Sequence, residues 1–246
     1  IKGAQMQIEG KNSVKESLTS NARISKLFVA KNAHDLQPIV DIARERNTRL
    51  EFVDKMEMDK MSETKRHQGL IAIVEDYAYT PLAEILSAQP INPNGKFILL
   101  LDGIEDPQNL GSIIRVAECA GVDGIVIPNR RAVGVNATVV KTSAGACQHI
   151  KIALVTNIND VIRTLKDKFY NVFCADMDGK ELYSAHLDGG DIAIVIGGEG
   201  EGVKSLTRKL CDDALSIPQF GKVNSLNASV ACGIVCYEVV RQRKAK

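Results

Sequence analysis

The polar side chains that could take part in chemistry gather in three loops in the second half of the chain. These loops span residues 102–115, 197–202 and 216–231, and each follows a short apolar run that is typical of a strand. In an open α/β sheet, ligands bind at the carboxyl ends of the strands. We therefore expect the three loops to meet at one edge of a sheet and to form a binding site there.

The last loop is the richest of the three in polar residues. It holds Pro218 and Gly221, and it enters a long apolar helix through a cluster of Asn and Ser side chains. Side-chain oxygens at a helix start accept hydrogen bonds from unpaired backbone N–H groups, but capping a helix uses only one or two of them. The additional polar residues indicate a binding surface.

The glycine-rich loop matches neither common nucleotide-binding fingerprint. Its pattern, Gly198-x-Gly200-x-Gly202, is not G-x-G-x-x-G, and no G-K-[ST] is present. Glu199 and Glu201 would also repel a pyrophosphate on this turn. Taken alone, the pattern slightly favours a plain strand-to-helix turn whose glycines supply positive φ angles.

The first loop offers two candidate site residues, Asn109 and Arg115, which also have structural interpretations. Asn109 can cap a helix that begins at Leu110. Arg115 lies among apolar residues of the expected helix, and an arginine in such a position is usually a surface residue whose charged end reaches the solvent. It also lies near a helix start that should face the edge shared by the three loops, so it is a candidate contact for a phosphate or a substrate.

The elements that must position these loops alternate along the chain. Strands are expected at 96–102, 124–128, 152–155, 171–175, 191–196 and 214–218, and helices at 110–120, 137–146, 159–169 and 226–241. This alternation predicts an α/β domain with a largely parallel sheet and helices on both faces.

The first part of the chain predicts a smaller α/β module. Strands are expected at 24–30, 50–53 and 69–74, and a helix at 35–47. Residues 77–95 contain three prolines and weak periodicity, which favours a connecting segment. The sequence thus predicts domains at 1–76 and 96–246, joined by a linker at 77–95.

The bulk composition excludes several classes of protein. A net charge of +1 excludes a protein that coats polyanions through charge alone, although it leaves room for a local basic patch. Six scattered cysteines without a C-x-x-C pair predict free thiols and no metal, as in a reducing cytoplasm. No apolar run approaches the ~20 residues of a membrane span. We expect a soluble cytoplasmic protein that binds no metal and no membrane.

Together the three loops resemble the three motifs of the SPOUT-class RNA 2′-O-ribose methyltransferases, and more narrowly those of the TrmH-like family. The order and separation of the motifs match over roughly 150 residues. The opening Glu9-Gly10-Lys11-Asn12-Ser13-Val14 is similar to the ribosomal-protein-like RNA-binding domain of the subgroup that methylates 23S ribosomal RNA. The matching segments are Asn109-Leu110-Gly111-Ser112-Ile113-Ile114-Arg115, residues 194–202, Ile217-Pro218 and Ser225-Leu226-Asn227-Ala228-Ser229-Val230-Ala231.

The resemblance implies a fold, a cofactor and a set of site residues. The fold would be a parallel α/β sheet whose C-terminal segment forms a trefoil knot, in a homodimer with each active site near the subunit interface. S-adenosylmethionine would lie bent in the knot, with Arg115 as the central catalytic residue. The residues implied to hold the cofactor are Ile196, Gly198, Ile217, Pro218, Leu226 and Asn227, and those implied to shape the catalytic site are Asn109, Glu199, Ser225 and Asn227.

The implied reaction is 2′-O-methylation of a guanosine in 23S ribosomal RNA. The family often assigns the role of base to the arginine, but a pKa above ~12 makes that demanding. A role that fits the chemistry of a guanidinium better is to bind the adjacent phosphate and so orient the ribose. The basic end at 241–246 favours a structured ribosomal target. The alternatives are a transfer RNA 2′-O-methyltransferase, an antibiotic-resistance relative acting on ribosomal RNA, and a non-catalytic RNA-binding or ribosome-assembly factor.

Overall fold

The computed structural model shows two compact units, Ile1–Ala78 and Tyr79–Lys246. The residues that it describes are 5–19, 24–31, 35–75, 77–198, 200, 202–222 and 225–244. Within these ranges, no helix is both long enough and apolar enough to cross a membrane.

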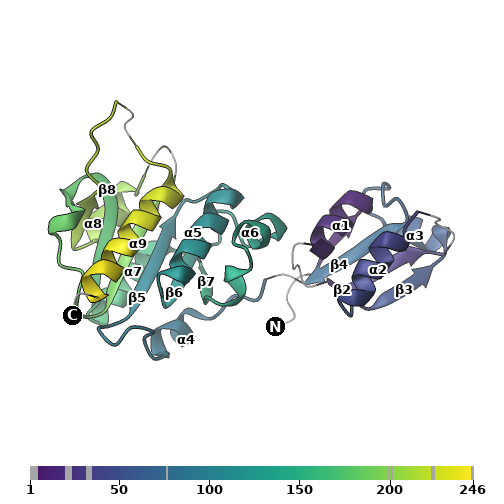
Figure 1. The fold of residues 1–246 in the computed structure, drawn as a ribbon, viewed down its shortest axis with the longest axis horizontal. Helices are drawn as coiled ribbons and strands as arrows, with labels where there is room; N and C mark the ends of the chain where they lie inside the picture. The colour runs from purple at the N-terminus through teal and green to yellow at the C-terminus, as the bar shows by residue number, and fades with distance from the viewer. Residues whose placement is uncertain are drawn as a thin grey trace. The chain divides into compact units, whose positions relative to one another are not determined.

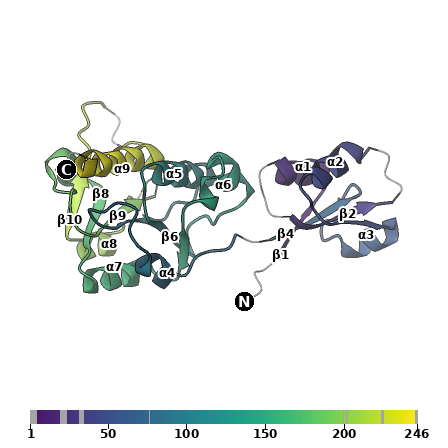
Figure 2. The ribbon, with the colours of Figure 1, turned by 60° about the horizontal axis from the view of Figure 1, so that its bottom comes forward.

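The first unit is a four-stranded sheet with helices on both faces. Its elements are β1 (Gln5–Glu9), α1 (Lys11–Thr19), β2 (Ile24–Ala30), α2 (Gln37–Glu45), β3 (Leu50–Val53), α3 (Lys55–Met61) and β4 (Leu70–Glu75). The strand order is β1-β4-β2-β3; β2 and β3 run parallel, whereas β4 is antiparallel to both its neighbours. Helices α1 and α2 cover one face and α3 the other (Figure 2). The three expected strands are confirmed, but the short polar segments β1 and α3 have too little apolar periodicity to be predicted.

Glu9, at the end of β1, fastens the loop that follows α3. Its carboxylate accepts hydrogen bonds from Ser62 Oγ at 2.8 Å, from the backbone N–H of Glu63 at 2.6 Å, and from Thr64 Oγ1. Burial acts to raise the pKa of Glu9. The hydrogen bonds from Thr64, Ser62, Gln7 and Glu63 outweigh burial and lower the pKa from 4.5 to about 2. An ionised carboxylate therefore holds this loop.

The second unit is built on a six-stranded parallel sheet. Its elements are α4 (Leu82–Ser87), β5 (Phe97–Asp102), α5 (Pro107–Cys119), β6 (Gly124–Pro128), α6 (Ala137–Thr142), β7 (Ile152–Val155), α7 (Ile158–Asp167), β8 (Asn171–Glu181), β9 (Ile192–Gly197), α8 (Ser205–Leu210), β10 (Asp213–Ser216) and α9 (Ala228–Lys244). The strand order is β10-β8-β9-β5-β6-β7, and every neighbouring pair is parallel. The predicted parallel sheet is confirmed.

Helices cover both faces of this sheet. Helices α5, α6 and α9 lie on one face, and α4, α7 and α8 lie on the other (Figures 1 and 2). All six residues of β5 are buried, as expected for a strand with helices on both sides. After β10, at one edge of the sheet, the chain crosses to α9, which packs on α5. The trefoil knot stays a prediction.

The segment expected as a linker belongs largely to the second unit. Residues 82–87 form α4, and Ile85 is buried in the core of that unit. Pro81 stands before the helix, where a proline is tolerated, so it does not interrupt α4. Lys96 is buried, and its ammonium donates hydrogen bonds to the carbonyl oxygens of Ile85 and Leu86, at 3.0 and 2.8 Å, and to that of Ala88. The end of α4 is thus fastened to the start of β5.

Candidate functional site

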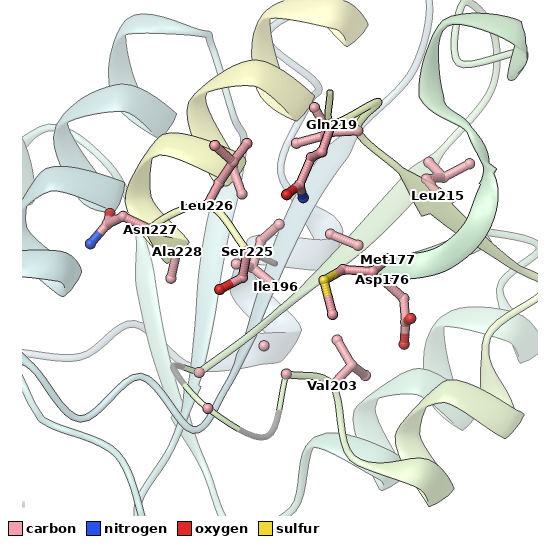
Figure 3. Close-up of a pocket in the computed structure, with 17 residues that line it drawn as sticks. Asp176, Met177, Ile196, Val203, Leu215, Gln219, Ser225, Leu226, Asn227 and Ala228 are labelled. Carbon is pink, nitrogen blue, oxygen red and sulfur yellow. The ribbon is translucent and has the colours of Figure 1, made fainter. Parts of the chain in front are cut away.

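A cavity of about 530 Å³ lies at the carboxyl ends of β9 and β10, along the middle of β8 and beside the start of α9 (Figure 3). This is the edge of the sheet at which ligands bind in open α/β folds. It is lined by Ala175, Asp176, Met177, Ile196, Gly197, Gly198, Gly200, Gly202, Val203, Leu215, Ile217, Gln219, Ser225, Leu226, Asn227, Ala228 and Ala231. The second and third polar loops of the sequence therefore meet here, as predicted.

Both apolar and polar side chains line this cavity. Ile196 and Leu215 are each 2% exposed and form the wall on the side of the sheet. Figure 3 shows the Gln219 amide, the Ser225 hydroxyl and the Met177 thioether around the same space. Such a lining suits a ligand that combines an apolar ring system with a few hydrogen-bonding groups.

The glycine turn after β9 is shaped by the close approach of the loop after β5. The Gly198 N–H donates to the Asp102 carbonyl oxygen at 2.9 Å. A Cβ atom on Gly198 would lie 2.0 Å from the carbonyl oxygen of Gly103, so this position admits only glycine. Gly200 and Gly202 do have positive φ angles, 91° and 62°. The interpretation as a turn with positive φ angles thus holds for these two glycines, whereas Gly198 serves the contact between the loops.

Asn109 does not cap a helix, contrary to one sequence-based interpretation. Helix α5 begins at Pro107, and its N-cap is Asp106, which accepts hydrogen bonds from the N–H groups of Gln108 and Asn109. Asn109 lies in the first turn, and its Oδ1 accepts a hydrogen bond of 2.9 Å from Asn227 Nδ2. The Asn109 side chain therefore joins the first polar loop to the third.

Asn227 has two functions in this arrangement. Its Oδ1 accepts hydrogen bonds from Ser229 N at 2.9 Å, Ser229 Oγ at 2.6 Å and Val230 N at 3.3 Å, which caps the start of α9. Its Nδ2 makes the bond to Asn109, and Figure 3 shows the amide directed away from Ser225, toward α5. One side chain thus fixes both the start of α9 and its position relative to α5.

Besides Asn109, two predicted site residues, Arg115 and Pro218, are not among the residues that line the first cavity. Arg115 is exposed in the middle of α5, lines neither of the two cavities at this edge, and makes no hydrogen bond or ion pair within the described part of the chain. Pro218 is not among the lining residues, although its neighbour Ile217 is. Glu199 lies outside the described residues.

A second cavity, of about 640 Å³, adjoins the first and shares Gly198 and Gly202 with it. Asp102, at the end of β5, is 4% exposed, and it accepts hydrogen bonds from Lys204 Nζ at 2.6 Å and Thr207 Oγ1 at 2.9 Å. These contacts with the buried Asp102 carboxylate fix the start of α8. The lining residues are Asp102, Gly103, Ile104, Glu105, Asp106, Asn109, Arg131, Gly198, Gly202 and Lys204.

The lining residues that were not predicted as site residues include Asp176, Met177 and Gln219. Asp176 Oδ2 forms an ion pair of 3.3 Å with Arg208 Nη1. The signal that could have found Asp176 and Met177 is their position, because they directly follow the apolar run expected to end at Ala175. Gln219 lies in the third polar loop, which the sequence marks as a whole, but no pattern distinguishes it from the other residues of that loop.

Both units match known protein families. Residues 96–237 match the SpoU rRNA Methylase family, and residues 7–80 match the family described as RNA 2'-O ribose methyltransferase substrate binding. The chain is 40% identical over 237 residues to a Bacillus subtilis (strain 168) protein named for the TrmH family of tRNA/rRNA methyltransferases, covering 95% of this chain and 94% of that one. A Staphylococcus saprophyticus protein named for the same family is 38% identical over 241 residues, with coverages of 97% and 96%.

Among solved structures, the chain is similar to the SpoU methyltransferase AviRb from Streptomyces viridochromogenes, which was crystallised with the cofactor AdoMet. The TM-score is 0.67 at 21% sequence identity, over 98% of this chain and 92% of that one. At this level of identity, the likeness concerns the fold.

The fold and the first cavity place the protein among the α/β proteins that hold a ligand at the carboxyl ends of a parallel sheet. The matches over both units then show the family. The chain belongs to the SpoU rRNA methylase family and is an RNA methyltransferase of the SpoU/TrmH type.

Proposed function

We propose that the protein transfers the methyl group of S-adenosylmethionine to the 2′-hydroxyl of a ribose, and that its target is a guanosine of 23S ribosomal RNA. The observation that carries the proposal is the first cavity, which lies at the expected edge of the sheet and brings Ser225, Leu226 and Asn227 next to the glycine turn. The N-terminal match to a substrate-binding family supports an RNA partner. The six free cysteines support a cytoplasmic location.

The residues of the first cavity fit S-adenosylmethionine. Its volume of about 530 Å³ suits a ligand of this size. Apolar walls at Ile196, Leu215 and Leu226 would hold the adenine ring, and the Asp176 carboxylate would accept hydrogen bonds from hydroxyl or ammonium groups. When bound, the cofactor supplies a methyl group on a sulfonium, which a hydroxyl oxygen can attack in line. AviRb, which shares the fold, was crystallised with this cofactor.

The chain's own contribution would be to hold the acceptor ribose in place. The bond between Asn109 and Asn227 fixes the first and third loops at 2.9 Å, and such positioning supplies much of the acceleration of a two-substrate reaction. The Arg115 guanidinium would bind the phosphate beside the target ribose and orient its 2′-hydroxyl. Glu199 and Ser225 would complete the polar surroundings of that hydroxyl.

Because Arg115 lines neither cavity of its own chain, we infer that each active site takes this residue from a second subunit. The surface of α9 supports a homodimer. Val230 and Tyr237 lie two turns apart on this helix and are 50% and 52% exposed, and Leu226, just before it, is 39% exposed. Contiguous exposed apolar side chains on one helix face are typical of a contact between proteins.

The test is transfer of labelled methyl from S-adenosylmethionine to ribosomal and transfer RNA in parallel, with mapping of the labelled nucleotide. We expect label on a ribose of 23S ribosomal RNA. Label on transfer RNA alone would favour the transfer RNA alternative. Tight cofactor binding without label on either RNA would favour an assembled-particle substrate or the non-catalytic assembly factor.

Two variants test the role of Arg115. We expect Arg115→Ala to lower kcat about 100-fold or more and to change the Kd for S-adenosylmethionine by less than about twofold. Glu118→Gln, an exposed change on the same helix, should leave both unchanged. Mixing Arg115→Ala with an inactive Gly198→Ala chain should restore about a quarter of the wild-type activity, since half of randomly mixed dimers are mixed and each has one intact site. No recovery would argue against a shared site.

A further inference from the structure

The second cavity lies between the loops that follow β5 and β6. The N–H of Val133 donates to the Ile104 carbonyl oxygen at 2.9 Å, so the two loops run side by side. The glycine turn at Gly198 and Gly202 closes the remaining side and separates this cavity from the first. Asn109 lines the second cavity, while its partner Asn227 lines the first. A ligand that spans both cavities would therefore pass between these two amides and the glycine turn.

Most charged groups in the second cavity already have partners. Asp102 is paired with Lys204 at 2.6 Å, and Asp106 caps α5. Glu105 and Arg131 are exposed, and neither makes a hydrogen bond or ion pair within the described ranges of the chain. Among the described residues that line it, the cavity thus presents one unpaired carboxylate and one unpaired guanidinium to a ligand.

These two groups define the chemistry of the ligand. A guanidinium binds phosphate in a bidentate fashion, and a carboxylate accepts hydrogen bonds but repels phosphate. The ligand should therefore carry an anionic group at one end and neighbouring N–H donors at the other. Among the four standard nucleotides, guanosine alone has two adjacent donors on its pairing edge, N1–H and the 2-amino group, and these match the two oxygens of a carboxylate.

We propose that the second cavity holds the acceptor guanosine, with Glu105 accepting hydrogen bonds from the guanine edge. Arg131 would bind one of the two phosphates that flank this nucleotide in the RNA, and the other would be left to Arg115. The inference rests on the proposed function and specifies the substrate end of the same site. The ribose would then lie near Asn109 and the glycine turn, next to the first cavity. Glu105 would select guanosine over other nucleosides, since an unpaired donor or acceptor in the cavity disfavours a base that lacks the matching group.

The experiment measures kcat/KM for methyl transfer to RNA with matched pairs of variants. Arg131→Ala is compared with Arg130→Ala, an exposed arginine one residue away that does not line the cavity. Glu105→Gln is compared with Glu118→Gln. We expect Arg131→Ala and Glu105→Gln to lower kcat/KM by about tenfold or more, with the Kd of S-adenosylmethionine within about twofold of wild type, and the two control variants to match wild type.

A second arm replaces the mapped guanosine by inosine, which lacks the 2-amino group, in a synthetic RNA fragment. Wild type should lose about tenfold in kcat/KM on inosine, whereas Glu105→Gln should show little further loss. Three results would each overturn the inference while leaving the methyltransferase activity standing. The first is full discrimination between guanosine and inosine by Glu105→Gln, and the second is label on a nucleoside other than guanosine. The third is equal kcat/KM for Arg131→Ala and Arg130→Ala. Absence of methyl transfer by wild type on any RNA would overturn both.

Discussion

Asn227 offers a substitution that separates the stability of α9 from the geometry of the site. Its Oδ1 caps α9, and its Nδ2 holds Asn109 of α5. Asn227→Ala removes both functions. Asn227→Asp keeps an oxygen acceptor for the helix start, where a negative charge is favourable, but it cannot donate to Asn109.

The expected magnitudes follow from these contacts. Loss of a helix cap costs about 1 kcal/mol, and loss of an exposed hydrogen bond between neutral side chains costs about 0.5–1.5 kcal/mol. Asn227→Ala should therefore destabilise the second unit by about 1.5–2.5 kcal/mol. For a unit of this size, each kcal/mol lowers Tm by about 2–4 °C. Asn227→Asp should stay within about 1 kcal/mol of wild type, because its stronger cap offsets part of the lost hydrogen bond.

The assay combines calorimetric unfolding with methyl transfer to RNA. We expect Asn227→Asp to unfold near the wild-type Tm and yet to transfer methyl at least about tenfold more slowly, since the carboxylate cannot donate the hydrogen bond that holds Asn109 Oδ1 in its present orientation. Asn109→Ala, which removes the same link and leaves the cap of α9 intact, serves as the matched variant. Wild-type activity in both Asn227→Asp and Asn109→Ala would refute a catalytic role for this link, and an unfolding temperature of Asn227→Asp as low as that of Asn227→Ala would refute the cap.

Three further predictions concern stability. In the folded protein the pKa of Glu9 is about 2, below its ordinary 4.5, so the ionised carboxylate stabilises the fold fully above about pH 4.5 and this stabilisation is lost as the pH falls toward 2. Thermal unfolding between pH 2 and 6 should therefore depend less on pH in Glu9→Gln than in wild type. Lys96→Met leaves three carbonyl oxygens at the end of α4 without their buried donor, and urea unfolding should show a loss of about 2–3 kcal/mol, whereas an unchanged midpoint would contradict the cap. Asp102→Asn keeps the hydrogen bond to Thr207 but removes the charge facing Lys204, whose side chain is 41% exposed and can turn to water. Urea unfolding should therefore show a loss of only about 1–2 kcal/mol in the free energy of unfolding.

The sequence predicts the framework of the second unit well, because its strands are continuous apolar runs. Residues 124–128 and 152–155 form strands with the bounds expected from their composition. Helix starts are harder to predict, because several capping residues stand close together. Asp106, followed by Pro107, is as good a start signal as Asn109, and the structure uses the earlier one. The prolines and weak periodicity of 77–95 likewise hide α4, a short helix whose stability comes from burial of Ile85 rather than from its own sequence.

The sequence predicts only part of the candidate site, and there is a physical reason for this. Motif residues that lie at strand ends and in the last loop, such as Gly198 and Leu226, reach the cavity because the parallel sheet brings all its carboxyl ends to one edge. Arg115 instead lies on an exposed helix surface, where it has no hydrogen-bond or ion-pair partner among the described residues. In the proposed function this residue acts in the site of a second subunit, which the pattern of a single chain cannot place.

The most direct test of the central claim, that the first cavity holds the methyl donor, is a calorimetric titration of the protein with S-adenosylmethionine. Wild type should bind one molecule per chain. Gly198→Ala should bind at least about tenfold more weakly, because its Cβ would lie 2.0 Å from the Gly103 carbonyl oxygen and displace the turn, whereas Gly221→Ala, whose Cβ meets nothing within 4 Å, should bind as wild type does. No binding by wild type, or undiminished binding by a Gly198→Ala variant, would contradict the claim.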